Sequence, residues 1–429
     1  MRGGRIPAVI AVVSAVAVTG CSQSPRSTAS ASITPTPHEV TTSARYPDTG
    51  PGAATVLAAG HWSKLPAAPI IGREYAATGW TGRQMLVWGG QTGPYRERLL
   101  GDGAAYTPAT NRWSVLPASP LNARTGMASA WTGRELFVWG GYDRIGPKSA
   151  SFRAASDGAV YSPAANTWRK LPPAPLSPRV YASAVWTGSE VVLIGGQPAV
   201  VGAQRTGRVE AAAWNQSTDT WRRLATIAEP SPRQVLAIYV VNAGGTLYTW
   251  VLWATYITRG NSATGTQGID LEKYDPAVNR WHRMTTTGDV PAGFNQAPLW
   301  TGQEIINPAG RFDCGFASCP YSPARPGQRL TLATHSWSAI AAGPADNSAS
   351  MSLWTGSSLL TLSAVMPAAW DANHNKWYRL PRPPFAADQY GVATVWTGTQ
   401  LLQWGPMTPW SAVKREPRPY YAEGMSFTR

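Results

Sequence analysis

Residues 75–90 read Tyr-Ala-Ala-Thr-Gly-Trp-Thr-Gly-Arg-Gln-Met-Leu-Val-Trp-Gly-Gly. A short run of small residues ends at Trp80, a Thr-Gly turn follows, and an apolar run ends at a Gly-Gly pair. Gly82 suits a hairpin turn because glycine adopts positive φ without steric cost. The pattern predicts two short antiparallel strands joined by the two-residue turn Thr81-Gly82.

The residues that follow complete a four-stranded unit. Residues 103–106 form a third strand-like run, residues 107–111 a tight turn, and residues 112–116 a fourth run that ends before Pro117. Four short strands without a helix are typical of a β-propeller blade rather than of a helical solenoid. We expect the small residues of the first strand to lie beside a central channel, and the Trp of the fourth strand to pack between blades.

The unit is repeated along the chain. The tripeptide Trp-Thr-Gly begins at Trp80, Trp131, Trp186, Trp300, Trp354 and Trp396. The gap between the third and fourth copies is about twice the others, and the degenerate copy Val241-Asn-Ala-Gly244 lies near its middle. A second Trp follows each copy but the last, at Trp113, Trp168, Trp221, Trp281, Trp337 and Trp377. Repeats of roughly 40–60 residues with this content indicate a propeller.

The two ends of the repeat array complement each other. The last unit has two strands and a plausible third at residues 419–424, but no fourth strand, while residues 61–65 are a fourth strand without a blade. Joining them gives seven complete blades and removes the exposed sheet edges of an open array. The sequence therefore predicts an all-β, seven-bladed β-propeller of four-stranded antiparallel blades over residues 59–429, closed by an N-terminal latch strand.

These residues resemble the kelch repeats. That pattern has an Arg before the first strand, a Gly-Gly pair after the second, and an aromatic and a Trp in the third and fourth strands. The first three copies match at Gly89-Gly90, Tyr106 and Trp113; at Gly140-Gly141, Tyr161 and Trp168; and at Gly195-Gly196, Trp214 and Trp221. Copies four to seven drift, and Trp253-Ala254 stands where a Gly pair is expected.

The N-terminus reads as an export signal. Arg2 and Arg5 precede an apolar stretch too short to span a membrane, which ends in Val18-Thr-Gly-Cys21. This ending resembles a bacterial lipobox, in which the Cys receives a lipid. We therefore expect a lipoprotein signal peptide at residues 1–20, lipidation at Cys21, and a Ser/Thr/Pro/Ala-rich tether at residues 21–58. The protein would lie outside the cytoplasm, anchored to the cell membrane.

Cysteine usage and charge fit that location. Cys314 and Cys319 form an isolated pair, which outside the cytoplasm predicts a disulfide. Charged residues make up only 14% of the chain and hydrophobic residues 43%, which excludes a disordered protein. The net charge of +14 favours an acidic partner, and export argues against nucleic acid. We expect a monomer.

Four arginines are the first candidates for ligand contact. Each lies just before the first strand of blades one to four, so the repeat places them on one face near the channel: Arg73, Arg124, Arg179 and Arg233. They could clamp a carboxylate or phosphate, or they could belong to the repeat and hydrogen-bond loop carbonyls of an adjacent blade. Asp346 and Asp388 lie at comparable places in later blades and could serve as an acid/base pair.

The loops between second and third strands offer further candidates. They mix aromatic and cationic side chains, which suit sugars and acidic groups, at Tyr95, Arg96, Tyr142 and Arg144. The alternative is that these loops are simply solvated.

A metal site is not expected. The kelch resemblance extends to the galactose oxidase family, whose copper site needs two His, two Tyr and a cross-linked Cys at the channel mouth. The chain has five His: His38 in the tether, His61 in the latch, and the others in or beside fourth strands. We therefore expect no metal and no cofactor.

The sequence thus favours a non-catalytic binding module for a protein partner or an acidic envelope carbohydrate. The alternative is a metal-independent carbohydrate-active enzyme, a hydrolase or epimerase, with its site at the channel mouth. No catalytic constellation is recognisable.

The lipobox makes a direct prediction. A Cys21→Ser protein should leave the membrane fraction and be recovered as a soluble protein, because the lipid attachment site is gone. Fractionation of cells with an antibody to the propeller measures this. A variant that stays with the membrane would contradict lipidation at this residue.

Overall fold

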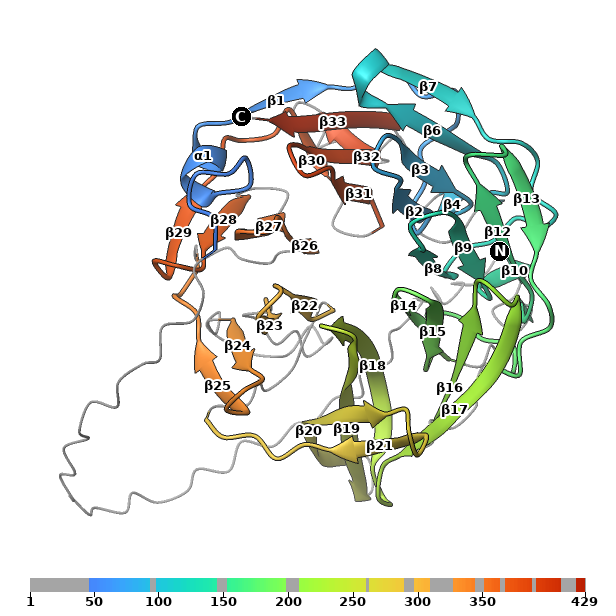
Figure 1. The fold of residues 1–429 in the computed structure, drawn as a ribbon, viewed down its shortest axis with the longest axis vertical. Coiled ribbons are helices and arrows are strands. Elements are labelled where there is room, and N and C mark those ends of the chain that lie inside the picture. The colour runs from blue at the N-terminus through green and yellow to red at the C-terminus, as the bar shows by residue number, and fades with distance from the viewer. Residues whose placement is uncertain are drawn as a thin grey trace, which may run out of the picture.

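The computed structural model describes residues 46–92, 98–144, 153–197, 208–259, 262–288, 297–308, 327–343, 351–362, 367–387, 391–409 and 422–428. Figure 1 shows their strands arranged as a ring of sheets around a central axis. The all-β, seven-bladed propeller predicted from the repeats is confirmed.

Each blade is a four-stranded antiparallel sheet whose strands follow one another from the axis outward. Blade 1 contains β2 (Ala77–Trp80), β3 (Met85–Trp88), β6 (Gly103–Thr107) and β7 (Arg112–Val115). Blade 2 contains β8 (Ala128–Trp131), β9 (Leu136–Trp139), β12 (Gly158–Ser162) and β13 (Thr167–Lys170). Blade 3 contains β14 (Ser183–Trp186), β15 (Glu190–Ile194), β16 (Arg208–Asn215) and β17 (Thr220–Ala228).

The second half of the ring follows the same order. Blade 4 has longer strands, β18 (Gln234–Ala243), β19 (Thr246–Arg259), β20 (Ser262–Asp275) and β21 (Arg280–Arg283). Blade 5 contains β22 (Leu299–Trp300), β23 (Glu304–Asn307), β24 (Gln328–Thr331) and β25 (Ser336–Ala339). Blade 6 contains β26 (Met351–Trp354), β27 (Ser358–Leu362), β28 (Ala368–Asp371) and β29 (Lys376–Arg379).

Blade 7 is built from both ends of the chain. It contains β31 (Ala393–Trp396), β32 (Leu401–Pro409), β33 (Ala422–Thr428) and the N-terminal β1 (His61–Lys64), and β30 (Phe385–Ala387) also pairs with β32. Strand β1 runs antiparallel to β33, from His61 opposite Thr428 to Lys64 opposite Met425 (Figure 1). The predicted latch is confirmed, and the described part of the third strand begins at Ala422; residues 419–421 of the expected strand lie outside the described residues.

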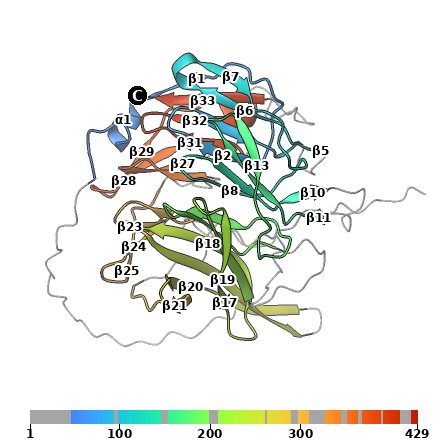
Figure 2. The same ribbon diagram turned by 45° about the vertical axis from the view of Figure 1, so that its right-hand side comes forward.

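The two faces of the ring carry different connections. The turn face carries the Trp-Thr-Gly turns and the turns between third and fourth strands, such as η1 (Pro108–Thr110). The loop face carries the residues before each first strand and the loops between second and third strands. Two of these loops begin as short ladders, β4 (Gln91–Thr92) with β5 (Arg98–Leu99) and β10 (Tyr142–Arg144) with β11 (Arg153–Ala154). Figure 2 shows β5, β10 and β11 at one side of the ring and α1 (Ala54–Ala58) at the other.

Each residue of the tripeptide Trp-Thr-Gly has its own physical role in the turn. Trp80 is paired with Met85, so the loop has four residues rather than the two that the sequence suggested. The Thr81 hydroxyl closes the loop by accepting a hydrogen bond from the Gln84 N–H at 2.8 Å. Gly82 takes a φ of 88°, which favours glycine. The same hydroxyl-to-backbone bond recurs at Thr132, Thr187, Thr301, Thr355 and Thr397.

The Trp of the tripeptide packs against the innermost strand of the preceding blade. A Cβ placed on Gly79 of blade 1 would lie 3.2 Å from the Leu136 Cδ1 and 3.5 Å from the Trp131 Cβ of blade 2, so the space for a side chain there is tight. This explains the small residues of the first strands: they leave room for the neighbouring tryptophan.

The Trp of every fourth strand donates a hydrogen bond across the blade boundary. In blades 1 to 3 the indole N–H of Trp113, Trp168 and Trp221 donates to the carbonyls of Pro66, Pro117 and Pro172 at 3.0–3.1 Å. The remaining four blades repeat the bond, with Trp62, Trp281, Trp337 and Trp377 as donors. The predicted position of these side chains between blades is confirmed, and the bond also fixes how neighbouring blades align.

The described segment that precedes the latch strand packs against the propeller. Tyr46 forms two hydrogen bonds on the turn face. Its backbone N–H donates to the Asn373 side-chain oxygen at 3.0 Å, and its hydroxyl is hydrogen-bonded to the Thr301 hydroxyl. Its ring lies 4.9 Å from that of Trp354, and α1 packs its buried Leu57 into the core of blades 6 and 7. Tyr46 and Leu57, near the two ends of residues 46–58, thus contact the propeller, while the domain bounds predicted from the sequence stay predictions. Within the described residues, no helix is long and apolar enough to cross a membrane.

The latch makes the stability of the ring depend on Trp62. Its indole donates to the Pro381 carbonyl at 2.8 Å and its ring lies 4.7 Å from that of Phe427. Trp62→Phe should lower the free energy of unfolding by about 1 kcal/mol through the lost hydrogen bond, and Trp62→Ala by about 2–4 kcal/mol. Chemical denaturation measures both values.

Val115→Ala is the matched control, because Val115 lies on a fourth strand and is 60% exposed. It should change stability by less than about 0.5 kcal/mol. A Trp62→Ala protein as stable as this control would refute the latch.

Candidate functional site

Three of the four pre-strand arginines are buried inside their own blades. Arg73, Arg124 and Arg179 are 1%, 0% and 6% exposed. Arg73 donates to the Gly89 carbonyl at 3.3 Å and to the two carboxylate oxygens of Asp102 at 2.8 and 3.2 Å. The Arg73 hydrogen bonds and charge outweigh the opposing effect of burial, so the pKa of Asp102 is lowered.

Blades 2 and 3 repeat this arrangement. Arg124 donates to the Gly140 carbonyl at 3.2 Å and to Asp157 at 2.9 Å, and Arg179 donates to the Gly195 carbonyl and pairs with Glu210. Each guanidinium therefore joins the end of the second strand to the start of the third. The bonded carbonyls belong to the same blade, not to an adjacent blade as the sequence suggested. A ligand would reach these three groups only by displacing carboxylates already bound to them.

Arg233 of blade 4 is placed differently because its blade lacks the Gly-Gly pair. Its guanidinium lies 3.6 Å from the ring centroid of Trp253, which occupies the first position of that pair. It donates to Glu229 at 3.2 Å and to Asp270 at 2.9 Å, and its side chain is 27% exposed. The large Trp side chain thus moves the cation toward the surface and adds a cation–π contact.

Blade 4 also gathers three carboxyl groups around two arginines. Arg283 on β21 pairs with Glu229 at 3.1 Å and with Asp270 at 3.0 Å. Glu272 lies two residues beyond Asp270 on β20, so both side chains lie on the same face of the sheet. Glu272 is 6% exposed, and its carboxylate forms no ion pair with any residue in the part of the chain that the structure describes.

These surroundings change how two of the carboxyl groups ionise. Burial, followed by the nearby charge of Glu229, raises the pKa of Glu272 to about 7, and Arg283 opposes this only in part. Burial and the neighbouring Asp270 also raise the pKa of Glu229, against the effect of Arg233 and Arg283. Near neutral pH this cluster therefore holds a proton that exposed carboxylates would release.

Three tyrosines from three blades meet on the loop face. The ring of Tyr181 lies 6.5 Å from that of Tyr75 and 6.1 Å from that of Tyr142, both edge-on. Tyr181 is 43% exposed, and Tyr75 and Tyr142 are partly exposed. We call these three residues the tyrosine cluster. Tyr142 was predicted as a ligand contact, whereas Tyr75 and Tyr181 were not.

The backbone of this cluster is unusual. Tyr75 and Tyr181 have φ values of 53° and 56°, in a region that glycine occupies at the equivalent positions of blades 2 and 7, Gly126 and Gly391. The N–H of Tyr75 donates to Gly391 and that of Tyr181 to Gly126, so each tyrosine is held by the preceding blade. A Cβ on Gly126 would lie 2.8 Å from the Tyr181 ring, and glycine is therefore required there. An aromatic two residues after the pre-strand Arg is the signal that sequence reading could have used.

Several predicted site residues lie outside the described residues. These are Cys21, Tyr95, Arg96, Cys314, Cys319, Asp346 and Asp388. Only the backbone of Arg144 is described, at the end of β10 opposite Arg153. The predicted lipidation, the disulfide and the acid/base pair of Asp346 and Asp388 stay predictions.

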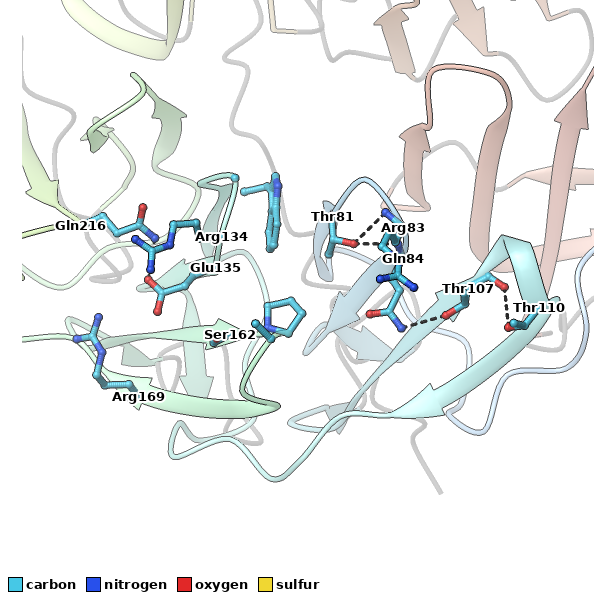
Figure 3. Close-up of a pocket in the computed structure, with 14 residues that line it drawn as sticks. Thr81, Arg83, Gln84, Thr107, Thr110, Arg134, Glu135, Ser162, Arg169 and Gln216 are labelled. Carbon is cyan, nitrogen blue, oxygen red and sulfur yellow. Dashed lines mark hydrogen bonds between the residues drawn. The ribbon is translucent and has the colours of Figure 1, made fainter.

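A cavity of about 780 Å³ opens on the turn face at blades 1 and 2. Figure 3 shows Arg83, Gln84 and Thr107 on one side of it and Arg134, Glu135 and Arg169 on the other. Gln216 of blade 3 donates to Glu135 at 2.8 Å, and Arg169 pairs with Asp219 at 2.6 Å. We call this the turn-face cavity. It lies on the face opposite the one where the sequence placed the ligand.

Histidines form no metal centre among the residues that are described. His374 contacts Asp371 at 2.9 Å, and His282 lies 4.0 Å from Asp275. No group of three or more potential metal ligands occurs within the described ranges.

A closed ring of seven four-stranded blades defines the protein as a β-propeller. The sequence pattern of the KLHDC2/KLHL20/DRC7 Kelch-repeats domain matches residues 74–310, which is more than half of the chain. The chain therefore belongs to the Kelch-repeat family. A solved structure titled "Structure of YjhT" is similar at 17% identity with a TM-score of 0.46, covering 65% of this chain and 87% of that chain. No curated protein matches the chain.

The blade 4 carboxyl groups predict a pH dependence of stability. Folding raises the pKa of Glu272 from 4.5 to about 7, so its contribution is fully present at low pH and lost as pH rises through 7. The free energy of unfolding should fall by roughly 2 kcal/mol between about pH 5 and about pH 8. Glu272→Gln, which keeps a neutral side chain, should reduce this fall and stabilise the protein at the higher pH.

The matched control is Asp275→Asn, which changes a carboxylate at the exposed end of the same strand. Its unfolding curves should retain the pH dependence of the parent. If the Glu272→Gln protein retained it as well, the titrating group would lie elsewhere.

Proposed function

We propose that this Kelch-repeat propeller is a lipid-anchored, extracytoplasmic, non-catalytic binding module that takes a partner protein on its loop face. Kelch propellers commonly serve in protein interactions, and the lipobox-like sequence before Cys21 supports the anchor. The observation that carries the proposal is the tyrosine cluster.

The tyrosine cluster has the composition of an interface centre. Tyrosine offers a large, rigid contact area with a polar end, and it is enriched at the energetic centres of protein interfaces. Tyr75, Tyr142 and Tyr181 come from three blades, so one partner segment would contact all three at once.

The backbone strain supports a functional role for the cluster. A non-glycine residue at positive φ costs on the order of 1–3 kcal/mol, and such residues gather at binding and catalytic sites. Both strained tyrosines are partly exposed, so their rings do not repay the cost by filling the core. A partner that packs on these rings would use a surface already fixed in shape before binding.

The loop face is charged as well as aromatic. Arg153 is half exposed and donates to the buried carboxylate of Asp143 at 2.8 Å, beside Tyr142. Arg153 thus presents a half-exposed guanidinium, paired with Asp143, on the loop face. An acidic loop of a partner would meet Arg153 rather than the buried pre-strand arginines.

The carboxyl groups of blade 4 are poorly placed to act on a substrate. Acid/base chemistry needs a raised pKa, which Glu229 and Glu272 have. It also needs contact with a substrate, and these side chains are 7% and 6% exposed. Their burial assigns the cluster to the stability of blade 4.

Photo-cross-linking in intact cells tests the proposal. A photoreactive phenylalanine analogue at position 181 should yield a covalent product with one discrete protein, because the side chain contacts the partner directly. Tyr142→Ala in the same chain should weaken that product, since interface tyrosines often contribute about 2 kcal/mol, or roughly 30-fold in affinity.

The same analogue at position 278 is the matched control, because Val278 is 64% exposed in the turn of blade 4 on the opposite face. It should give no product of that mass. Equal products from both positions, or none from position 181, would remove the tyrosine cluster as the interface.

A further inference from the structure

The turn-face cavity carries an independent inference. Its two turns have the sequence Trp-Thr-Gly-Arg, at residues 80–83 and 131–134, whereas the other copies have Ser189, Gln303, Ser357 and Thr399 in place of Arg. Only blades 1 and 2 therefore present an arginine at this position, and the ring places them side by side around one cavity.

The two turn arginines are available to a ligand. Arg83 and Arg134 are exposed, and neither guanidinium pairs with a carboxylate of any described residue. This contrasts with the pre-strand arginines, each of which is bound to an acidic side chain. Arg169 is the third arginine of the lining, and it forms an ion pair with Asp219. Glu135 is the one acidic residue of the lining. The lining thus has three positive side chains and one negative one.

The rest of the lining is polar rather than apolar. It presents hydroxyl groups from Thr81, Thr107, Thr110 and Ser162 and amides from Gln84 and Gln216. Trp131 adds one aromatic side chain. Such a set of donors, acceptors and a single ring matches the hydroxyl groups and flat faces of a sugar better than the apolar side chains of a peptide.

The positions of the polar groups are fixed by the fold. Gln84 donates to Thr107 at 3.0 Å, and Gln216 donates to both Thr132 and Glu135 at 2.8 Å. These bonds connect the Trp-Thr-Gly turns to the turns between third and fourth strands within and between blades. The walls of the cavity are therefore held in place before any ligand arrives.

We propose that the turn-face cavity binds an acidic glycan, with Arg83 and Arg134 taking its anionic groups. Guanidinium groups bind carboxylates and phosphates in a bidentate manner, and a volume of about 780 Å³ lies within the range of ordinary ligand sites. The cavity and the tyrosine cluster lie on opposite faces, at opposite ends of the first strands. Both can be occupied at once, and neither proposal depends on the other.

Titration calorimetry with the full chain in detergent tests the glycan site. The probes are an oligogalacturonate, its fully methyl-esterified neutral form, and inorganic phosphate. The acidic oligosaccharide should bind, with an affinity that falls as ionic strength rises, because salt screens exposed charges. Arg83→Gln with Arg134→Gln should weaken this binding by at least roughly 30-fold.

Two controls separate the site from charge in general and from misfolding. Arg280→Gln removes an exposed arginine at the start of the fourth strand of blade 4 and should leave the affinity unchanged. Melting temperatures should match the parent in all variants, because exposed side chains contribute little to stability. Arg83→Lys should bind with intermediate affinity, since it keeps the charge and loses the bidentate geometry.

Three results would overturn the proposal. The first is that the parent and the double variant bind the oligogalacturonate with equal affinity. The second is that the parent binds the neutral, methyl-esterified form as tightly as the acidic form. The third is inorganic phosphate competing as well as the oligosaccharide, which would leave a simple anion site. An absence of binding by the folded parent would reject the acidic glycan, while the cross-linking test of the loop face would stand unaffected.

Discussion

The hydrogen bond from the indole of each fourth-strand tryptophan to the preceding blade is the contact on which the ring depends. In six of seven blades the acceptor is the carbonyl four residues after the corresponding Trp of the preceding blade, as in Trp168 to Pro117. In blade 5 the acceptor is the Thr286 hydroxyl. Buried N–H groups are usually hydrogen-bonded, and the acceptor of every fourth-strand indole belongs to a neighbouring blade. The same bond therefore sets the spacing of the blades all the way around, including the closure through Trp62.

Alignment of the blades creates two chemically different faces. On the turn face, Thr and Gly shape every hairpin in the same way, so the residues after Gly vary without cost to the fold. Arg83 and Arg134 occupy those variable positions. On the loop face, the buried arginines of blades 1 to 3 join the second strand of the blade to the third. The exposed aromatic side chains lie two residues after such an arginine, at Tyr75 and Tyr181. In both cases the repeat supplies the frame, and the variable positions supply the side chains of the two proposed sites.

Blade 4 shows what happens when the repeat is broken. Trp253 replaces the first glycine of the pair, so Arg233 stacks on its ring instead of entering the blade. Glu229 and Asp270 then share two arginines, and burial raises the pKa of the neighbouring Glu272 to about 7. The strands β18, β19 and β20 are also longer than their counterparts. One substitution in the pattern thus coincides with a change in packing, charge and ionisation.

The sequence by itself determined the number of blades, their strands and the closure by residues 61–65, because these depend on periodic spacing and local turn chemistry. It also located the arginine before each first strand of blades 1 to 4, and left open whether that arginine contacts a ligand or belongs to the repeat. The tertiary structure decided what those arginines do, since whether Arg73 meets a ligand or Asp102 depends on a residue far away in the chain. The tertiary structure also brings Tyr75, Tyr142 and Tyr181 together and places Arg83 and Arg134 around one cavity. Each of these sets comes from different blades, and only closure of the ring brings blades side by side.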